Sequence, residues 1–441
     1  MLTTLSDTPH NQIRRSTQPL RVLIGADTFP PDVNGAANFA SRLAAGLTAR
    51  GHTVQVEAPA SSRVRGAFLE SHEGAEFVVH RVSSLRWYPH DWLRIVLPWR
   101  SQAYAARILD EFKPDVVHIQ SHIVVGRGLA RQAAKRGIRV IGTNHFMPEN
   151  LIDHTLLPHF ARKWVIQAAW KDASATFGYC EAVTSPSRKA ADFLETETKL
   201  ERVHAISCGI DAALYTPDFE PRTANRVIFV GRVTGEKHLE VLLKAISLID
   251  PALDVKLEIV GGGDQLNQLK QVTRELGIDN RVTFSGYLTD TQLRAALTRS
   301  TVFAMPSIAE LQSIATMEAM ASGLPIVAAN AMALPHLVHE GENGYLFEPD
   351  NARELAHKLS LVLRLPETKL QAMKRASLRN IRAHDIQRTL TIFEQLYRGE
   401  PVTDPVTESE PHSASDPVSH VVSHVVSQSV SDSLTDTSLD E

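Results

Sequence analysis

Two glutamates, Glu310 and Glu318, lie eight residues apart in the stretch PSIAELQSIATMEAMASGLP at 306–325. On one helix with 3.6 residues per turn, they would stand about 80° apart around the axis. Pro306 and Ser307 instead favour a loop that carries Glu310 and a following helix that carries Glu318. One carboxylate could then bind a sugar and the other a ribose. The alternative interpretation is a pair of solvated glutamates.

An anion site is expected next to these carboxylates. Backbone N–H groups near Ser313–Ala315 would open the helix and could hold a diphosphate. Arg232 and Lys237 follow a predicted strand in FVGRVTGEKHLEVLLKAI at 229–246. Two cations at a cleft can neutralise a leaving nucleoside diphosphate, whose charge grows in the transition state. Surface ion pairs are the alternative for both side chains.

Histidines follow predicted strands in the first half of the chain. The stretch DVVHIQSHIVVG at 115–126 places His118 at the C-terminal end of a strand, where α/β folds bind ligands, with His122 shortly after it. A satisfied structural histidine is the alternative for each.

The loop GTNHFMPENL at 142–151 follows the next strand. It should present three polar residues to the same cleft as acceptor or sugar contacts, with simple loop capping as the alternative: His145, Glu149 and Asn150.

The elements that position these residues form two series. Apolar runs at 21–26, 54–59, 115–120 and 139–144 alternate with helical spacing, and the alternation restarts at 226–233. The pattern predicts two doubly wound α/β domains that face each other across a cleft. The expected segments are a flexible N-terminus at 1–19, an acceptor-side domain at 20–195, a donor-binding domain at 196–375, a helical segment at 376–400, and a disordered Ser/Val/Asp-rich tail at 401–441.

Length and composition agree with a protein that buries large cores rather than with a small binding module. The chain has 441 residues, of which 43% are hydrophobic and 22% charged, and its two cysteines suit a reducing compartment. No signal peptide or membrane span is expected, so the predicted location is cytoplasmic. The basic first half suits phosphates or an anionic membrane face, and no nucleic-acid-binding motif accompanies it.

The E-x7-E spacing with the continuation AMASGLPIVAAN resembles the donor-site signature of glycosyltransferase family 4, whose members are retaining enzymes with the GT-B fold of two facing Rossmann-like domains. FVGRVTGEKHLEVLLKAI, VGGGD at 260–264 and the opening FPPDVNGAANFASRLAAGLTARGH resemble other family segments in the usual order. The resemblance implies that a C-terminal helix returns to the first domain. It implies donor contacts at Gly35, Gly231, Arg232, Lys237, Gly262, Glu310, Ser313, Ile314, Ala315 and Glu318.

Three departures from the family pattern stand out. Gln120 occupies the second position of an expected His-x-His, which leaves open whether His118 or His122 serves the active site. Ser313 stands where members often have a glycine, and His336 where many have a glutamate. The last two could alter donor choice.

The implied reaction moves a hexose, glucose or mannose, from a UDP- or GDP-sugar to an acceptor hydroxyl, with no cofactor and no metal. No Asp-x-Asp pair occurs in the chain, and the leaving phosphate itself would help deprotonate the acceptor, as is proposed for the family. A soluble sugar or polysaccharide acceptor, a nucleotide-sugar epimerase and a non-catalytic sugar-nucleotide sensor are the rival interpretations. A nicotinamide dehydrogenase is disfavoured because the opening loop lacks G-x-G-x-x-G.

A lipid acceptor is favoured because the chain resembles family members that glycosylate diacylglycerol, a glycolipid or phosphatidylinositol. Trp87, Trp92 and Trp99 interleave with arginines at 84–100. Aromatic rings and cations together form an interfacial anchor, so peripheral contact with an anionic membrane is expected. Core packing of these rings is the alternative.

Overall fold

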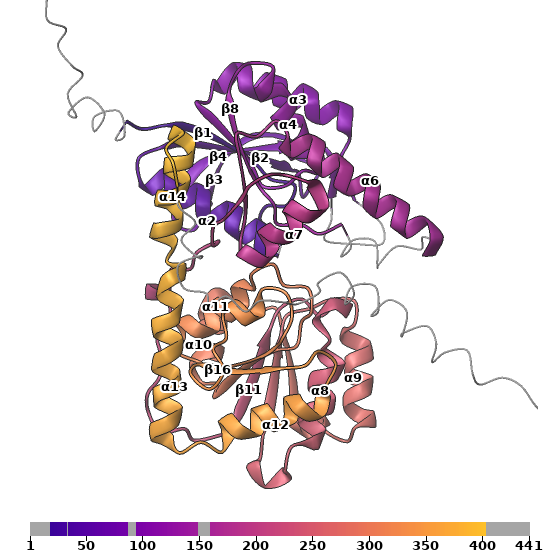
Figure 1. The fold of residues 1–441 in the computed structure, drawn as a ribbon, viewed down its shortest axis with the longest axis vertical. Coiled ribbons are helices and arrows are strands. Elements are labelled where there is room, and N and C mark those ends of the chain that lie inside the picture. The colour runs from indigo at the N-terminus through magenta and orange to yellow at the C-terminus, as the bar shows by residue number, and fades with distance from the viewer. Residues whose placement is uncertain (1–17, 33, 87–93, 149–158, 403–441) are drawn as a thin grey trace, which may run out of the picture. The chain divides into compact units, whose positions relative to one another are not determined.

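The structure is a computed structural model that describes residues 18–32, 34–86, 94–148 and 159–402. These residues form two large sheets, whose strands alternate with helices along the chain, and one small two-stranded sheet (Figure 1). The prediction of two doubly wound α/β domains is thereby confirmed. The tail predicted from residue 401 and the N-terminal segment 1–19 lie almost wholly outside the described residues.

The first sheet has eight strands, of which β3 pairs antiparallel with its neighbour β4 and the others pair in parallel. Across the sheet, the strands are β10 Val203–Ala205, β9 Ala182–Ser185, β8 Arg139–Thr143, β7 Val116–Ile119, β1 Arg21–Gly25, β2 Thr53–Pro59, β4 Ala75–Val82 and β3 Gly66–His72. A separate antiparallel pair consists of β5 Ser84–Arg86 and β6 Arg94–Val96. The helices of this domain are α2 Gly35–Ala49, α3 Pro98–Phe112, α4 Val124–Ala134, α6 His159–Phe177 and α7 Arg188–Thr198.

The central strand β1 shows why both faces of this sheet carry helices. Val22 and Ile24 pack into one hydrophobic cluster with α2, whereas Leu23 packs into another with α3 and α4. Side chains of a strand alternate between faces, so a strand covered on both sides appears in the sequence as one continuous apolar run. The run at 21–26 therefore correctly predicts a buried parallel strand.

The second sheet has six parallel strands. Across the sheet, they are β13 Val282–Gly286, β12 Lys256–Val260, β11 Arg226–Val230, β14 Val302–Met305, β15 Ile326–Ala329 and β16 Gly344–Phe347. Its helices are α8 Leu239–Leu248, α9 Leu266–Glu275, α10 Asp290–Thr298, α11 Ile314–Ala321, α12 Ala352–Leu363 and α13 Glu367–Asn380.

Each sheet reverses its strand order at one position. In the first sheet the reversal lies between β1 and β7, and in the second between β11 and β14. Open α/β sheets bind ligands at the carboxyl ends of strands where the order reverses. The loops that follow these four strands are therefore the places where a ligand is expected.

The chain passes between the two sheets twice. The strand β10 pairs with β9 in the first sheet, so that sheet extends past the boundary predicted at residues 195 and 196. The backbone of Ile210 then exchanges hydrogen bonds with the returning segment, accepting from Ile386 at 3.1 Å and donating to His384 at 2.8 Å. The returning segment leads into α14, Ile386–Arg398.

Helix α14 belongs to the first domain, as the family resemblance implied. Leu390, Phe393 and Tyr397 lie in the hydrophobic cluster that contains α2 and one face of the first sheet (Figure 1). A Cβ atom placed on Gly46 of α2 would lie 2.6 Å from a methyl carbon of Leu390. A larger residue at position 46 would therefore push the two helices apart.

A buried chain of hydrogen bonds joins α14 to the sheet. His118 of β7 is fully buried, with Nδ1 2.7 Å from the Tyr397 hydroxyl and Nε2 2.7 Å from the Thr143 hydroxyl. The Thr143 hydroxyl in turn lies 2.7 Å from that of Thr184. Burial lowers the pKa of His118 to about 3, and nearby His145 adds to that effect. Both nitrogens of His118 are thus engaged inside the core, which favours the structural alternative for this residue.

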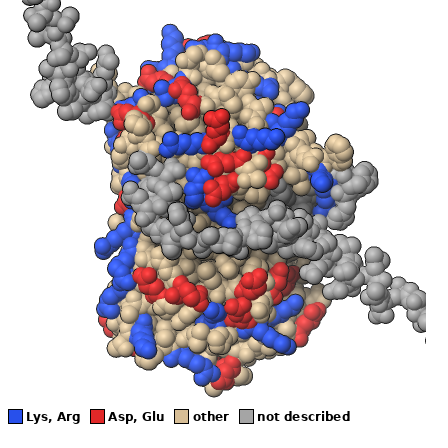
Figure 2. All heavy atoms as spheres, in the orientation of Figure 1, with Lys and Arg blue, Asp and Glu red and all other residues tan. Residues whose placement is uncertain are grey.

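Acidic and basic side chains are interspersed over the face shown in Figure 2. None of the helices in the described part of the chain combines the length and apolar character that a membrane span requires.

Tyr397→Phe should destabilise the protein by about 1–3 kcal/mol, because it leaves a buried ring nitrogen of His118 without a partner. Urea denaturation measures the change. Tyr179→Phe is the matched control, since Tyr179 is 42% exposed, and it should have little effect. Equal stability of the two variants would contradict a structural role for the His118 contact.

Candidate functional site

The predicted diphosphate and sugar ligands meet at the carboxyl end of the second sheet. Lys237 lies in the short 3-10 helix η2, Gly235–Lys237, after β11, and Glu310 lies in the loop between β14 and α11. Their side chains form an ion pair, and they are only 13% and 12% exposed. The two loops follow the neighbouring strands at which the strand order reverses. The structure thus brings Lys237 and Glu310 together, and their roles toward a donor stay predictions.

Glycines allow the loop after β12 to support the loop that carries Arg232 and Lys237. A Cβ atom on Gly261 would lie 1.9 Å from the carbonyl oxygen of Gly231, and one on Gly263 would lie 2.1 Å from that of Val233. The backbone N–H of Val233 donates to the carbonyl of Gly262 at 2.9 Å. Gly262, expected at the donor, is thus also part of the backbone that holds the cationic loop.

Arg232 forms an ion pair within the same loop. Its Nη2 lies 3.0 Å from Oε1 of Glu236, which also accepts a hydrogen bond of 2.7 Å from the Thr234 hydroxyl. The backbone carbonyl of Glu236 accepts from the Ser307 hydroxyl at 3.2 Å, so the loop after β11 is joined to the loop after β14. Arg232 thus forms an ion pair, as the alternative interpretation of this residue predicted. Its partner Glu236 directly precedes Lys237 in the chain.

The start of α11 has a conformation that would suit the glycine often found at this position in the family. Ser313 has φ +67° and ψ +78°, the left-handed region in which glycine is favoured. Its hydroxyl lies 2.8 Å from that of Thr316. Because the first amides of a helix have no partner within it, those at Ile314 and Ala315 lie at a position suited to an anion.

A second helix begins next to this one. A Cβ atom placed on Gly35, the first residue of α2, would lie 3.6 Å from Cδ1 of Ile314, the first residue of α11. The side chain of Asn34 caps α2 by accepting from the N–H of Ala37 at 2.9 Å. Two helix N-termini therefore adjoin, and both favour negative charge.

Glu318 is buried inside α11, one turn beyond its start. Its Oε1 lies 3.1 Å from Nη2 of Arg42, which comes from α2 of the first domain. Tyr215, which follows the 3-10 helix η1 Ala212–Leu214, also hydrogen-bonds to Glu318. Burial, and then the negative charge of Glu318, raise the pKa of Tyr215. The alternative of solvated glutamates is wrong for Glu318 and for the paired Glu310.

The loop between Glu310 and α11 is held from outside the second sheet. Oε1 of Gln312 accepts from the N–H of Cys208 at 2.8 Å, and its Nε2 donates to the Ser207 hydroxyl at 2.8 Å. The hydroxyl of Ser187, which caps α7, donates to the carbonyl of Leu311 at 2.7 Å. This loop is thus fixed to the first passage of the chain between the sheets.

The first domain contributes Gln120 and His145 from the loops after β7 and β8. Nε2 of His145 lies 3.0 Å from Oε1 of Gln120, and its ring lies 4.9 Å from that of Phe39. Burial lowers the pKa of His145 to about 4. Nε2 of Gln120 is buried without a hydrogen-bond partner. An unsatisfied buried amide is costly, so it is a group that a sugar hydroxyl could satisfy.

His122 lies in an aromatic pocket. Its ring centre is within 6.4 Å of the ring centres of Phe146, Trp170 and Phe177, and its Nδ1 is buried without a partner. Burial, followed by the charge of Arg127, lowers its pKa to about 4. His122 is therefore neutral at physiological pH. Glu149 and Asn150, predicted beside His145, lie outside the described residues.

Three residues of this site were absent from the sequence prediction: Arg42, Gln120 and Tyr215. Arg42 follows Gly35 by seven residues, which is nearly two helical turns. The two residues therefore lie on one face of α2, and that spacing could have identified Arg42. Gln120 was noted only as a departure, although its position at a strand end could have placed it in the site. Tyr215 has no comparable signal.

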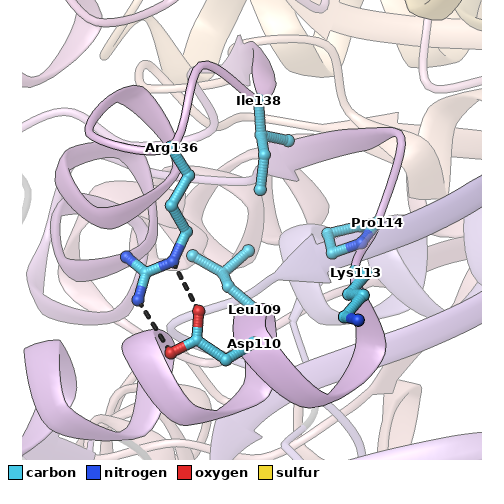
Figure 3. Close-up of a pocket in the computed structure, with 6 residues that line it drawn as sticks. All are labelled: Leu109, Asp110, Lys113, Pro114, Arg136 and Ile138. Carbon is cyan, nitrogen blue, oxygen red and sulfur yellow. Dashed lines mark hydrogen bonds and ion pairs between the residues drawn. The ribbon is translucent and has the colours of Figure 1, made fainter.

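Two other features of the described residues bear on ligands. No group of three or more His, Cys, Asp or Glu side chains there could hold a metal ion. A hollow of about 370 Å³ is lined by Leu109, Lys113, Pro114 and Ile138 together with the ion pair of Asp110 and Arg136 (Figure 3). Pro114 and Ile138 precede β7 and β8, so this hollow lies at the opposite end of the strands from the candidate site.

The comparisons with known proteins cover both domains. Residues 33–214 match the model described as Glycosyltransferase Family 4, and residues 217–379 match the model described as glycosyl transferases group 1. Two relatives are described as GDP-mannose-dependent alpha-mannosyltransferases. The protein from Corynebacterium glutamicum is 27% identical over 76% of this chain and 79% of its own. The protein from Mycolicibacterium smegmatis is 29% identical over 75% and 85%, respectively.

The fold has a solved counterpart. Sucrose-phosphate synthase from Thermosynechococcus elongatus superposes with a TM-score of 0.73 at 19% identity, covering 87% of this chain and 99% of that one. At this identity the likeness concerns the fold.

His122→Phe should make stability less dependent on pH. The pKa of this histidine is about 6.5 in the unfolded chain and about 4 in the folded protein. Below pH 6.5 the unfolded chain therefore binds the proton more readily, and the folded protein loses stability as the pH falls. At pH 5.5 the loss is about 1.4 kcal/mol. Urea denaturation at pH 7.5 and 5.5 measures how far the unfolding free energy falls between the two pH values. This fall should be smaller in the variant by that amount.

His357→Phe is the control, because His357 is exposed, and it should leave the pH dependence unchanged. An equal pH dependence of wild type and His122→Phe would contradict a neutral His122.

Proposed function

This chain is a glycosyltransferase of family 4 with the GT-B fold, and we propose that it transfers a hexose, with retention, from a nucleoside diphosphate sugar to a hydroxyl of a membrane lipid. The observation that carries the donor side is the ion pair of Lys237 with Glu310. A cation for the diphosphate and a carboxylate for the sugar are in contact where the bond between sugar and phosphate must lie. Glu318, one helical turn beyond the start of α11, would accept hydrogen bonds from the ribose hydroxyls.

The cations act on the leaving group. As the bond from C1 of the sugar to the diphosphate oxygen breaks, negative charge grows on the diphosphate. Arg232, Lys237 and the amides at the start of α11 would stabilise this charge without rearranging, which is where preorganised groups contribute most. A new bond forms from C1 to the acceptor oxygen, and the acceptor proton passes to the leaving phosphate. The proposal assigns no metal to this step.

GDP-mannose is the first donor to test. Two relatives that are 27% and 29% identical to this chain over the aligned residues are described as dependent on it. The sequence interpretation kept UDP-sugars and glucose open, and pocket contacts to the base and to the sugar hydroxyls decide between them. Gln120 and His145 lie where the first domain could contact the transferred sugar or the acceptor.

The lipid acceptor is supported by exposed aromatic side chains of the first domain. Trp99 is 68% exposed and Trp164 is 75% exposed. On α6, exposed Lys163 precedes Trp164 and exposed Lys171 follows it by about two helical turns, so the helix carries both an exposed ring and cations, as is common at a membrane interface. Trp170 is 3% exposed and belongs to the core. Trp87 and Trp92 lie outside the described residues.

Lys237→Met should lower kcat for mannosyl transfer by about 100-fold to 1,000-fold, because the leaving diphosphate loses a preorganised cation. Transfer of labelled mannose from GDP-mannose to a total lipid extract measures it, with UDP-glucose in parallel and each reaction run with and without EDTA. Lys256→Met is the matched control, since Lys256 is 45% exposed and pairs with Asp254. Activity that survives Lys237→Met, or that EDTA abolishes, would contradict the proposed chemistry.

Trp164→Ser should weaken binding to vesicles that contain anionic phospholipid by about threefold or more, because the ring leaves the interface. Flotation at low salt measures the bound fraction. Leu248→Ser removes a side chain of the second domain that is 55% exposed, and it should have no effect. Transfer to soluble mannosides without vesicle binding would instead favour the soluble-acceptor alternative.

A further inference from the structure

Glu318 is held by a cation from the other domain. Arg42 lies on α2, and its Nη2 is 3.1 Å from Oε1 of Glu318 on α11. The two side chains are 20% and 10% exposed, so the ion pair is largely withdrawn from solvent. Burial acts to lower the pKa of Arg42, but Glu318, Tyr215 and Glu73 together outweigh burial, so the pKa is raised. Arg42 therefore carries its charge beside the Glu318 carboxyl group.

The ion pair lies behind the anion site rather than in it. Gly35 adjoins Ile314 where the two helices begin. Arg42 lies nearly two turns beyond Gly35, and Glu318 lies about one turn beyond Ile314. The contact thus joins the two helices along their length, while their N-termini remain directed at the place proposed for the diphosphate.

Arg42 has few other contacts. Its Nε is 3.8 Å from Oε1 of Glu73, and its Nη1 is buried without a hydrogen-bond partner. On the other side, Glu318 also accepts from Tyr215. A carboxylate has about four lone-pair sites, so these two donors leave room for a ribose diol.

We propose that Arg42 is a positioning residue for the donor: it keeps Glu318 charged and oriented so that the ribose hydroxyls can bind. This inference rests on the ribose role of Glu318 in the proposed function. Without Arg42, the carboxylate would be an uncompensated buried charge, which takes up a proton or turns away. A protonated carboxyl group is a weaker acceptor, and a carboxylate that turns away is out of reach, so either change weakens the ribose hydrogen bonds. The ribose site therefore depends on both domains.

The test measures binding of GDP and of 2′,3′-dideoxy-GDP by calorimetry, with the UDP pair in parallel. Arg42→Met should weaken binding of the nucleotide with both hydroxyls by about 10-fold to 100-fold. It should weaken binding of the dideoxy analogue by less than about twofold, and Arg42→Lys should restore most of the affinity. A merely structural residue would affect both nucleotides equally.

Arg50→Met is the matched control on the same helix, because Arg50 pairs with Glu394 of α14, 2.8 Å away. It should leave both affinities unchanged. Equal losses for the two nucleotides, unchanged binding, or tighter binding in Arg42→Met would overturn the inference.

Glu318→Gln separates this inference from the proposed function. If the variant discriminates less between the two nucleotides than wild type does, the ribose role holds, and Arg42→Met decides the inference alone. If Glu318→Gln binds both nucleotides as wild type does, the ribose role fails, and the inference fails with it. The double variant should be no weaker than Glu318→Gln, since Arg42 acts through that carboxylate.

Discussion

The adjacency of β11 and β14 is the constraint on which the proposed donor site depends. These strands lie far apart in the chain but pair in parallel, because the strand order of the second sheet reverses between them. Their carboxyl ends therefore bring the loop of Lys237 to the loop of Glu310. A cation and a carboxylate in largely buried loops stabilise each other, whereas either alone would be an uncompensated charge. The pairing of β11 with β14 thus also brings together the two loops of the proposed site.

The surrounding backbone keeps these two loops from moving independently. The glycines after β12 let one loop pack against another through the backbone. Gln312 fixes the loop before α11 to the passage between the sheets. In the first domain, one ring nitrogen of His118 lies within hydrogen-bond distance of Tyr397 on α14 and the other of Thr143 on β8, so this side chain joins the helix to the sheet. Preorganised groups of this kind stabilise developing charge without the cost of rearrangement.

The sequence predicted the fold well because parallel strands buried on both faces produce continuous apolar runs, such as the one at 21–26. It also predicted that Glu310, Lys237 and Arg232 lie in loops at the carboxyl end of the second sheet, because the positions of these loops follow from those strands. Contacts between distant elements could not be predicted in this way. The buried contact of His118 is with Tyr397, which lies nearly 280 residues later in the chain. The ion-pair partner of Glu318 likewise comes from the other domain.

The central claim is that the donor diphosphate lies between the cations of the β11 loop and the start of α11. A crystal structure of the full chain with GDP bound tests it most directly. We predict phosphate oxygens within hydrogen-bond distance of Arg232, Lys237 and the amides at Ile314 and Ala315, with the ribose hydroxyls on Glu318. A nucleotide bound elsewhere, for example in the hollow beside Asp110 and Arg136, or a diphosphate that contacts neither cation, would contradict it.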